Sequence, residues 1–425
     1  MILVITNDQT DFSVQKLWQS MKNMGFKVSE SERARYLIAG MRECDESYST
    51  FNVVQGAVID TADGREKNEL ELTKLVSRKK QAEPRIKAVL MESTIVCEYS
   101  DALRYRTQLP VFDVLTMVDF LHQSTSPNPR FGSTDSRFSW VDQGGEPDMD
   151  LLAARWRYLD PTKLPVVGIL RIDYSYPPAP GDVDHPNSYF YKTVKETAKG
   201  LTFKAVQAAQ PLTKEQREGM ERAIKNLEAI GVSGITGDCG FLMNYQAEAR
   251  TIAKVPCFVS SMLQCPLLSA FYSNSEQFLV LTANGESLRP ALSSMLSLCC
   301  VDESVHSRFH VVGCENVPGF DAVAKGEAVD VERVKPGVVD LVLNEIDQRP
   351  QVRAIMLECT ELPPYADALR CATNMPVLDA ITLVDFFHSA ISDNPFVGMN
   401  FQSSTRVSSP QLSSPDQLPD TVQYL

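Results

Sequence analysis

The feature that most constrains the fold is an internal repeat at the scale of a domain. Residues 88–132 align without a gap to residues 354–398. Both copies contain the patterns Tyr-x-Asp-Ala-Leu-Arg, Pro-Val-x-Asp, Val-Asp-Phe-x-His and Asn-Pro, in that order. With gaps the match extends back, so that roughly 1–132 is a second copy of 278–398. A single repeat over this distance indicates a duplicated lobe, since solenoid units recur at least three times with a period of about 20 to 50 residues.

Each copy alternates short apolar runs with longer amphipathic stretches. Runs rich in Val, Ile and Leu at 278–281, 310–312 and 354–357 predict buried strands, and apolar residues at helical spacing over 334–347 predict a helix. Strands that alternate with helices are typical of βαβ units on a parallel sheet. We therefore predict an α/β fold in which each copy forms one lobe.

Residues 165–275 form another α/β stretch, which has no partner upstream. Its expected elements are strands at 165–173, 235–236 and 257–260 and helices at 214–230 and 242–252. The chain is therefore predicted to hold a two-lobed parallel-sheet domain at 165–401, preceded by an extra, degenerate copy of its second lobe at 1–132. Residues 133–164 are expected to be a linker, and the tail at 402–425, rich in Ser, Pro and Gln, is expected to be disordered.

Composition narrows the classes of partner. The 41 Lys and Arg residues against 54 Asp and Glu residues give a net charge of −13, which argues against nucleic acid and against an anionic membrane as partners. No apolar run reaches the roughly 18 residues of a membrane-spanning helix. The first eight residues lack the basic region of a signal peptide, and ten cysteines without framework spacing are expected to be reduced. We expect a cytoplasmic protein, with a plastid left open if the N-terminus is incomplete.

Two cysteines stand where strands of the two-lobed domain are expected to end. Cys239 lies in Thr-Gly-Asp-Cys-Gly-Phe, and Cys359 lies in Glu-Cys-Thr-Glu-Leu-Pro-Pro at the equivalent place in the next lobe. Unpaired N–H groups at the start of a following helix would favour the thiolate. Because ligands of open parallel sheets bind beyond the carboxyl ends of the strands, the two thiols could face each other across a cleft. Six others are expected to be ordinary packed cysteines: Cys257, Cys265, Cys299, Cys300, Cys314 and Cys371.

These two motifs resemble the aspartate/glutamate racemase superfamily, whose members use two cysteines on opposite lobes to move a proton at a carbon next to a carboxylate. Longer segments within 165–400 are similar to the Alma-type algal dimethylsulfoniopropionate lyases. They include Lys-Gly-Leu-Thr-Phe-Lys-Ala from Lys199, Ser-Ser-Met-Leu-Gln-Cys-Pro from Ser260 and Val-Gly-Cys-Glu-Asn-Val-Pro-Gly-Phe from Val312. The resemblance implies a racemase-like two-lobed domain that works without cofactor or metal. The extra front copy departs from that family's single-domain plan.

The chemistry that the resemblance implies fits a thiol base. Dimethylsulfoniopropionate has acidic hydrogens next to its carboxylate and a dimethylsulfonium leaving group on the next carbon. A thiolate that removes the α-proton starts β-elimination to acrylate and dimethyl sulfide. Either cysteine could be the base. We favour Cys359, with Cys239 as the opposing acid/base or as a thiol that orients the substrate.

Donors are needed for the carboxylate, whose negative charge grows during the reaction. Thr236, Thr360 and the backbone of Gly240 match positions where the superfamily holds its substrate carboxylate. For each threonine, a structural role in capping the next helix is an equal alternative.

The sulfonium group is a permanent cation without hydrogen-bond donors, so aromatic faces suit it best. Tyr174, Tyr176 and Tyr365 lie in the motif segments and are predicted to hold it, and Asp173 would add electrostatic attraction. For Tyr174 and Tyr176 the alternative is packing at a strand end. The predicted partner is thus a zwitterionic small molecule.

The front copy lacks the cysteine that the proposed chemistry requires. Ser93 stands where Cys359 stands in the second copy, and a hydroxyl is too weakly acidic to remove the proton unassisted. We expect this lobe to be catalytically inactive and to serve structure or assembly. His306 and His310 do not make a convincing metal motif, and no nucleotide-binding pattern occurs. Two other functions stay open, a cofactor-independent amino-acid or hydantoin racemase and a non-catalytic assembly protein. We expect the protein to be a homo-oligomer.

Overall fold

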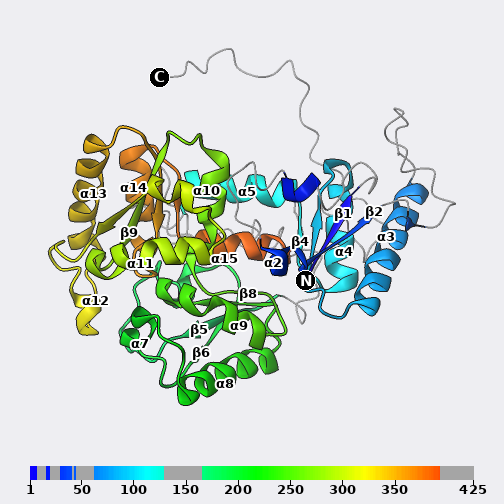
Figure 1. Ribbon diagram of the computed structural model, residues 1–425, viewed down its shortest axis with the longest axis horizontal. Coiled ribbons are helices and arrows are strands. Elements are labelled where there is room, and N and C mark those ends of the chain that lie inside the picture. The colour runs from blue at the N-terminus through cyan, green and yellow to red at the C-terminus, as the bar shows by residue number, and fades with distance from the viewer. Residues whose placement is uncertain (7–15, 20–28, 41–42, 45–61, 129–164, 393–425) are drawn as a thin grey trace, which may run out of the picture.

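The computed structural model describes residues 1–6, 16–19, 29–40, 43–44, 62–128 and 165–392, and these form three four-stranded parallel sheets (Figure 1). In each sheet the strand that comes first along the chain lies second in the order, flanked by the next two strands. Helices cover the sheets, which explains why most of the strands are apolar runs without alternation. The segments predicted as linker and tail, 133–164 and 402–425, lie outside the described residues.

The front lobe carries the sheet β2-β1-β3-β4. Its strands are β1 (Ile2–Thr6), β2 (Tyr36–Gly40), β3 (Ala88–Met91) and β4 (Val111–Phe112). Its helices are α2 (Glu30–Arg33), α3 (Ala62–Ala82), the 3-10 helix η4 (Thr94–Tyr99), α4 (Ser100–Thr107) and α5 (Val114–Thr125). Leu3, Val4 and Ile5 of the central strand are fully buried, so this lobe has a core of its own.

The first lobe of the two-lobed domain carries the sheet β6-β5-β7-β8. Its strands are β5 (Val167–Arg171), β6 (Thr193–Thr197), β7 (Gly234–Gly237) and β8 (Cys257–Phe258). Its helices are η6 (Pro186–Ser188), α7 (Phe203–Ala208), α8 (Lys214–Ile230), η7 (Gly240–Tyr245) and α9 (Gln246–Ile252), followed by η8 (Ser261–Gln264) and α10 (Cys265–Phe271). A capping box between Thr213 and Gln216 starts α8, and Gly231 ends it with a φ of 90°.

The second lobe carries the sheet β10-β9-β11-β12. Its strands are β9 (Gln277–Thr282), β10 (Phe309–Gly313), β11 (Val352–Leu357) and β12 (Val377–Leu378). Its helices are α11 (Gly285–Leu298), η9 (Glu303–Arg308), α12 (Ala322–Lys325), α13 (Val331–Gln348), η10 (Pro363–Tyr365), α14 (Ala366–Thr373) and α15 (Ala380–Ser389).

The predicted architecture is confirmed. Strands β1 and β9 occupy the same place in two sheets of the same order, and β5 to α10 make a separate lobe. The predicted helix at 242–252 is divided into η7 and α9, and the half-buried edge strand β6 was not predicted. Within the described ranges, no helix combines the length and apolar character that crossing a membrane requires.

A buried arginine ties α14 to the end of β12. Arg370 donates through Nη1 to Asp367 Oδ1 at 2.6 Å and through Nη2 to the Val377 carbonyl at 2.8 Å, and its Nη2 lies 3.4 Å from Asp379 Oδ2. The three charged side chains are at most 4% exposed. The front lobe repeats this cluster around Arg104. Each cluster therefore fixes the approach to the last helix of its lobe.

The segments that follow β7, β8 and β11 hold the two lobes together. Ser261 Oγ donates to the Glu358 carbonyl at 3.1 Å, and Thr360 Oγ1 donates to the Asp238 carbonyl. A Cβ at Gly240 would lie 2.1 Å from Glu358 Oε1 and 2.3 Å from the Glu358 carbonyl oxygen. Because the second of these atoms belongs to the backbone, no other residue fits there without displacing the second lobe. Because Cys239 and Cys359 lie within these segments, this junction brings the two strand-end cysteines to one place.

We expect Arg370→Ala to lower the free energy of unfolding by about 3 to 5 kcal/mol, because two buried carboxylates lose their cation. Chemical denaturation of the variant beside the wild type measures the loss. Arg353→Ala is the control, since Arg353 is 45% exposed and its ion pair with Glu276 should contribute about 1 kcal/mol or less. Equal losses in both variants would contradict the role of the buried cluster.

Glu358 should make stability depend on pH. Burial raises its pKa from 4.5 to about 7, and Thr282 Oγ1 donates to its Oε2 at 2.8 Å. The unfolded chain releases this proton at lower pH than the folded one, so stability falls as pH rises from 4.5 to about 7, by roughly 3 kcal/mol. Glu358→Gln stays neutral, and its unfolding free energy relative to wild type should therefore rise over that interval. Parallel pH profiles in denaturation would refute this.

Candidate active site

A pocket of about 240 Å³ lies between the two lobes and is lined by both strand-end cysteines. The first lobe contributes residues that follow β5 and β7, together with α7. The second lobe contributes the ends of β9 and β11 and the segment before α12. The residues that line it are Ile172, Tyr174, Tyr176, Phe203, Gln207, Asp238, Cys239, Gly240, Phe241, Thr282, Ala283, Asn284, Glu315, Phe320, Asp321, Ala324, Glu358, Cys359 and Glu361.

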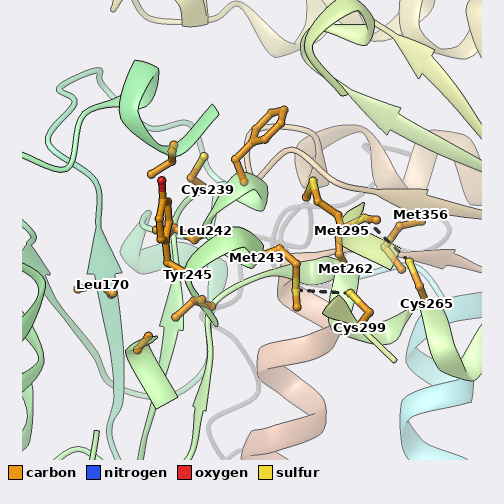
Figure 2. Packing of buried hydrophobic residues seen from close by; sticks show 14 of the residues in the cluster. Leu170, Cys239, Leu242, Met243, Tyr245, Met262, Cys265, Met295, Cys299 and Met356 are labelled. Carbon is orange, nitrogen blue, oxygen red and sulfur yellow. Dashed lines mark hydrogen bonds between the residues drawn. The ribbon is translucent and has the colours of Figure 1, made fainter. Parts of the chain in front are cut away.

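Cys239 directly follows β7 and is the N-cap residue of η7, with 6% of its surface exposed. Figure 2 shows it at one side of a core that is rich in sulfur. Deeper in that core, Cys299 Sγ lies 3.4 Å from Met243 Sδ, and Cys265 Sγ lies 3.9 Å from Met262 Sδ (Figure 2). Cys299 and Cys265 are thus packing residues, whereas Cys239 borders the pocket.

Cys359 follows β11 and lies against a buried carboxylate. Its Sγ donates to Glu361 Oε2 at 2.6 Å. Burial, reinforced by the charges of Glu361 and Glu358, raises the pKa of the Cys359 thiol well above its usual range. Burial followed by the Glu358 charge does the same to the pKa of Cys239. The expected helix-end activation is therefore outweighed, because desolvation and nearby carboxylates both disfavour a second negative charge.

Acidic side chains surround the pocket. Burial is the main cause that raises the pKa values of Asp182, Asp238 and Glu361. Arg171 compensates in part, with Nε 3.0 Å from Asp184 Oδ2 and 3.5 Å from Asp238 Oδ2, but it does not line the pocket. The described lining contains no lysine, arginine or histidine. Such a pocket favours a cationic group over an anionic one.

Aromatic rings from both lobes line the pocket. The Tyr174 and Tyr176 rings are stacked with centroids 6.1 Å apart and planes at 28°, and Phe203 of α7 lies 6.1 Å from Tyr174 on centroids. Phe241 and Phe320 also line the cavity. Electron-rich ring faces beside carboxylates are suited to a cation that has no hydrogen-bond donors.

The structure brings together five of the residues that the sequence singled out for the site. Cys239, Gly240, Cys359, Tyr174 and Tyr176 all line the pocket.

The other four do not line it, because each side chain has another partner. The Asp173 carboxylate accepts from Lys199 Nζ and from Gly200 N at the surface. Thr236 Oγ1 donates to the Phe258 carbonyl, and Thr360 Oγ1 donates to the Asp238 carbonyl. Tyr365 is 1% exposed and packs on Phe320. Both threonines thus make structural contacts. These contacts are not the helix caps that the sequence offered as an alternative: Thr236 bonds within its sheet, and Thr360 bonds across the junction between the lobes.

Several pocket residues were not predicted. Glu361 stands two residues after Cys359 in the motif itself, so its spacing could have revealed it. Phe203, Phe320 and Asn284 come from separate segments, and only the fold brings them together.

The front lobe keeps part of this arrangement without the reactive groups. Thr6 Oγ1 donates to Glu92 Oε2 at 2.9 Å, just as Thr282 donates to Glu358. At the positions of Cys359 and Glu361, however, the front copy has Ser93 and Ile95. The hydrogen bond from the strand-end threonine to the acid is therefore a structural feature of both copies, although Glu92 is exposed and Glu358 is buried. The thiol with its carboxylate partner is found in the second lobe alone of the two.

Comparisons with known proteins place the chain among characterised relatives. No family model matches the sequence. Dimethylsulfoniopropionate lyase 5 of Emiliania huxleyi (strain CCMP1516) is 50% identical over 415 residues, which are 96% of this chain and 80% of that protein. Dimethylsulfoniopropionate lyase 7 of the same strain is 47% identical over 56% of this chain and 70% of that protein. A dimethylsulfoniopropionate lyase of Durusdinium sp. clade D is 40% identical over 55% of this chain and 77% of that protein.

Solved structures show a weaker likeness. Arylmalonate decarboxylase is 17% identical, with a TM-score of 0.34 over 56% of this chain and 99% of that one. Picrophilus torridus aspartate racemase is 16% identical, with a TM-score of 0.32 over 54% of this chain and 95% of that one. Because the sequence identities and TM-scores are this low, these solved structures support no conclusion about the fold or function of this chain.

The similarity to lyase 5 extends over nearly the whole chain, front lobe included, because the aligned part is 96% of it. The resemblance to the algal lyases, first recognised from short motifs, is thus confirmed over nearly the whole sequence. This chain belongs to the dimethylsulfoniopropionate lyase family.

Proposed function

We propose that this chain cleaves dimethylsulfoniopropionate to dimethyl sulfide and acrylate in the pocket between Cys239 and Cys359. The observation that carries the proposal is the composition of that pocket, where two strand-end thiols meet an acidic and aromatic wall. The names of the curated relatives point to the same substrate. A racemase has no comparable use for a donor-free cation site.

The two ends of the substrate need different neighbours. The dimethylsulfonium group lies against Tyr174, Tyr176 and Phe203, where ring faces and buried carboxylates attract it. The carboxylate end is held by neutral donors, since no basic side chain lines the described pocket. Backbone N–H groups around Gly240 and the side-chain amide of Asn284 are the candidates.

Cys359 is the base, and Glu361 is its proton acceptor. The thiol proton passes from Sγ to the Glu361 carboxylate, 2.6 Å away, and the resulting thiolate removes the α-hydrogen as a proton. The electrons of that C–H bond form the double bond of acrylate. The bond from the β-carbon to sulfur breaks, its electron pair leaves with dimethyl sulfide, and Glu361 releases one proton to solvent. The positive substrate offsets the negative surroundings that disfavour a thiolate in the empty pocket.

Cys239 borders the same pocket, and among the described residues no carboxylate accepts a hydrogen bond from its thiol as Glu361 does from Cys359. It orients the substrate or serves as the opposing acid/base. The proposed division of labour therefore rests on the Cys359–Glu361 contact.

Cys359→Ala should reduce dimethyl sulfide release to background, because the proton acceptor at the α-carbon is lost. Headspace detection with purified protein measures this. Ser93→Ala, the same replacement at the equivalent position of the front lobe, should retain nearly full activity. Activity retained in Cys359→Ala would overturn the choice of base, and a wild type without release at any pH from about 6 to 9 would overturn the function.

Glu361→Gln should lower kcat by about 10²- to 10⁴-fold, the usual contribution of a positioned proton acceptor. Burial raises the pKa of Glu361, and only its ionised form accepts the thiol proton. Wild-type kcat should therefore rise with pH through this pKa, and that acidic limb should disappear in Glu361→Gln. Glu315→Gln, a matched change in the same lining, should keep the limb. An unchanged pH profile in Glu361→Gln would remove Glu361 from the mechanism.

A further inference from the structure

The front lobe contacts the second lobe through equivalent residues of the two copies. Helices α5 and α15 lie against each other at the centre of the molecule (Figure 1). Arg104 Nε of the front lobe donates to the Ala390 carbonyl at 3.0 Å, and Arg370 Nε of the second lobe donates to the Ser124 carbonyl at 3.0 Å. In the ungapped repeat, Arg104 corresponds to Arg370 and Ser124 to Ala390. The same bond is thus made once in each direction.

The aromatic contact between α5 and α15 also joins equivalent residues of the two copies. Phe120 and Phe386 are equivalent residues, and their rings meet with centroids 5.0 Å apart. Two equivalent residues touch each other only where a twofold axis passes between them. Reciprocal contacts around such an axis are the signature of an isologous interface, in which one surface is complementary to itself. The two lobes of one chain therefore meet as two identical subunits would.

The side of α5 that faces away from α15 has apolar residues with no first lobe packed against them in the described part of the chain. Val114, Val118 and Leu121 are 40%, 55% and 39% exposed. Their equivalents on α15 are Ala380, Val384 and Phe387, which are buried in a core shared with β5 of the first lobe. In the described part of the chain, the place beside α5 that corresponds to a first lobe is open. A complete two-lobed copy could stand where the front lobe stands.

We propose that the face of the second lobe around Phe386, Arg370 and Ala390 is a homotypic docking surface, and that its alternative partner is the same face of a second copy of this chain. The front lobe occupies this surface within the chain and so prevents that pairing. The donors and acceptors needed for pairing between two second lobes are all present, because Arg370 Nε would meet the Ala390 carbonyl of the other copy in the bond that Arg104 now makes.

The test uses the full chain. Arg104→Ala combined with Phe120→Asp removes the arginine and the aromatic ring that the front lobe contributes to the reciprocal contacts. The Ser124 carbonyl remains as an acceptor for Arg370, and the second lobe's face is unaltered. The uncovered face should then pair, so that the mass measured by light scattering doubles relative to wild type as protein concentration rises. This holds whether the front lobe detaches folded or unfolds, since α15 is uncovered in both cases.

Adding Phe386→Asp to the same variant is the matched control, because it damages the proposed surface on an otherwise identical chain. Association in the double variant that Phe386→Asp abolishes supports the proposal. Wild-type mass in the double variant contradicts it. Equal association with and without Phe386→Asp also contradicts it, since the attraction would then come from another surface.

Discussion

The close approach of Gly240 to the Glu358 side chain is the contact on which the site depends. It joins the turn after β7 to the turn after β11 with no space for a Cβ, and Ser261 and Thr360 reinforce it with bonds between the lobes. Both cysteines are neighbours of this contact along the chain. A parallel sheet places the ends of its central strands at one edge, and the junction brings two such edges together. The pocket is the space left beside that junction.

Burial of acidic groups then decides the chemistry. Burial, reinforced by the charges of neighbouring carboxylates, raises the pKa values of Asp238, Cys239 and Cys359, so the empty site disfavours negative charge. A cationic substrate relieves that cost, whereas an anion without a positive group would add to it. Under the proposed mechanism the thiol proton of Cys359 needs an acceptor at contact distance, because burial and nearby carboxylates raise the pKa of this thiol. Glu361 is at that distance.

Sequence reasoning predicted the elements whose signals are local. Helix α8 was predicted with its observed bounds because its apolar residues recur at helical spacing, and β9 and β11 were predicted because they are uninterrupted apolar runs. The edge strand β6 is half-buried and gives no such run. Asp173 was predicted to attract the sulfonium group because it is an acidic neighbour of Tyr174 in the motif segment, but Lys199 and Gly200 bind its carboxylate away from the pocket. Phe203 and Phe320 reach the pocket only through tertiary folding, which no local sequence pattern predicts.

The duplication that was visible in the sequence acquires a physical meaning in the fold, since the extra copy meets its parent lobe as a second subunit would. The central claim remains that Cys359 removes the α-proton as dimethyl sulfide leaves. Its most direct test is single-turnover release of dimethyl sulfide from substrate deuterated at the carbon next to the carboxylate. The account predicts slower release from the deuterated substrate in the wild type, and no release from either substrate in Cys359→Ala. Equal rates from both substrates, or release by the variant, would contradict it.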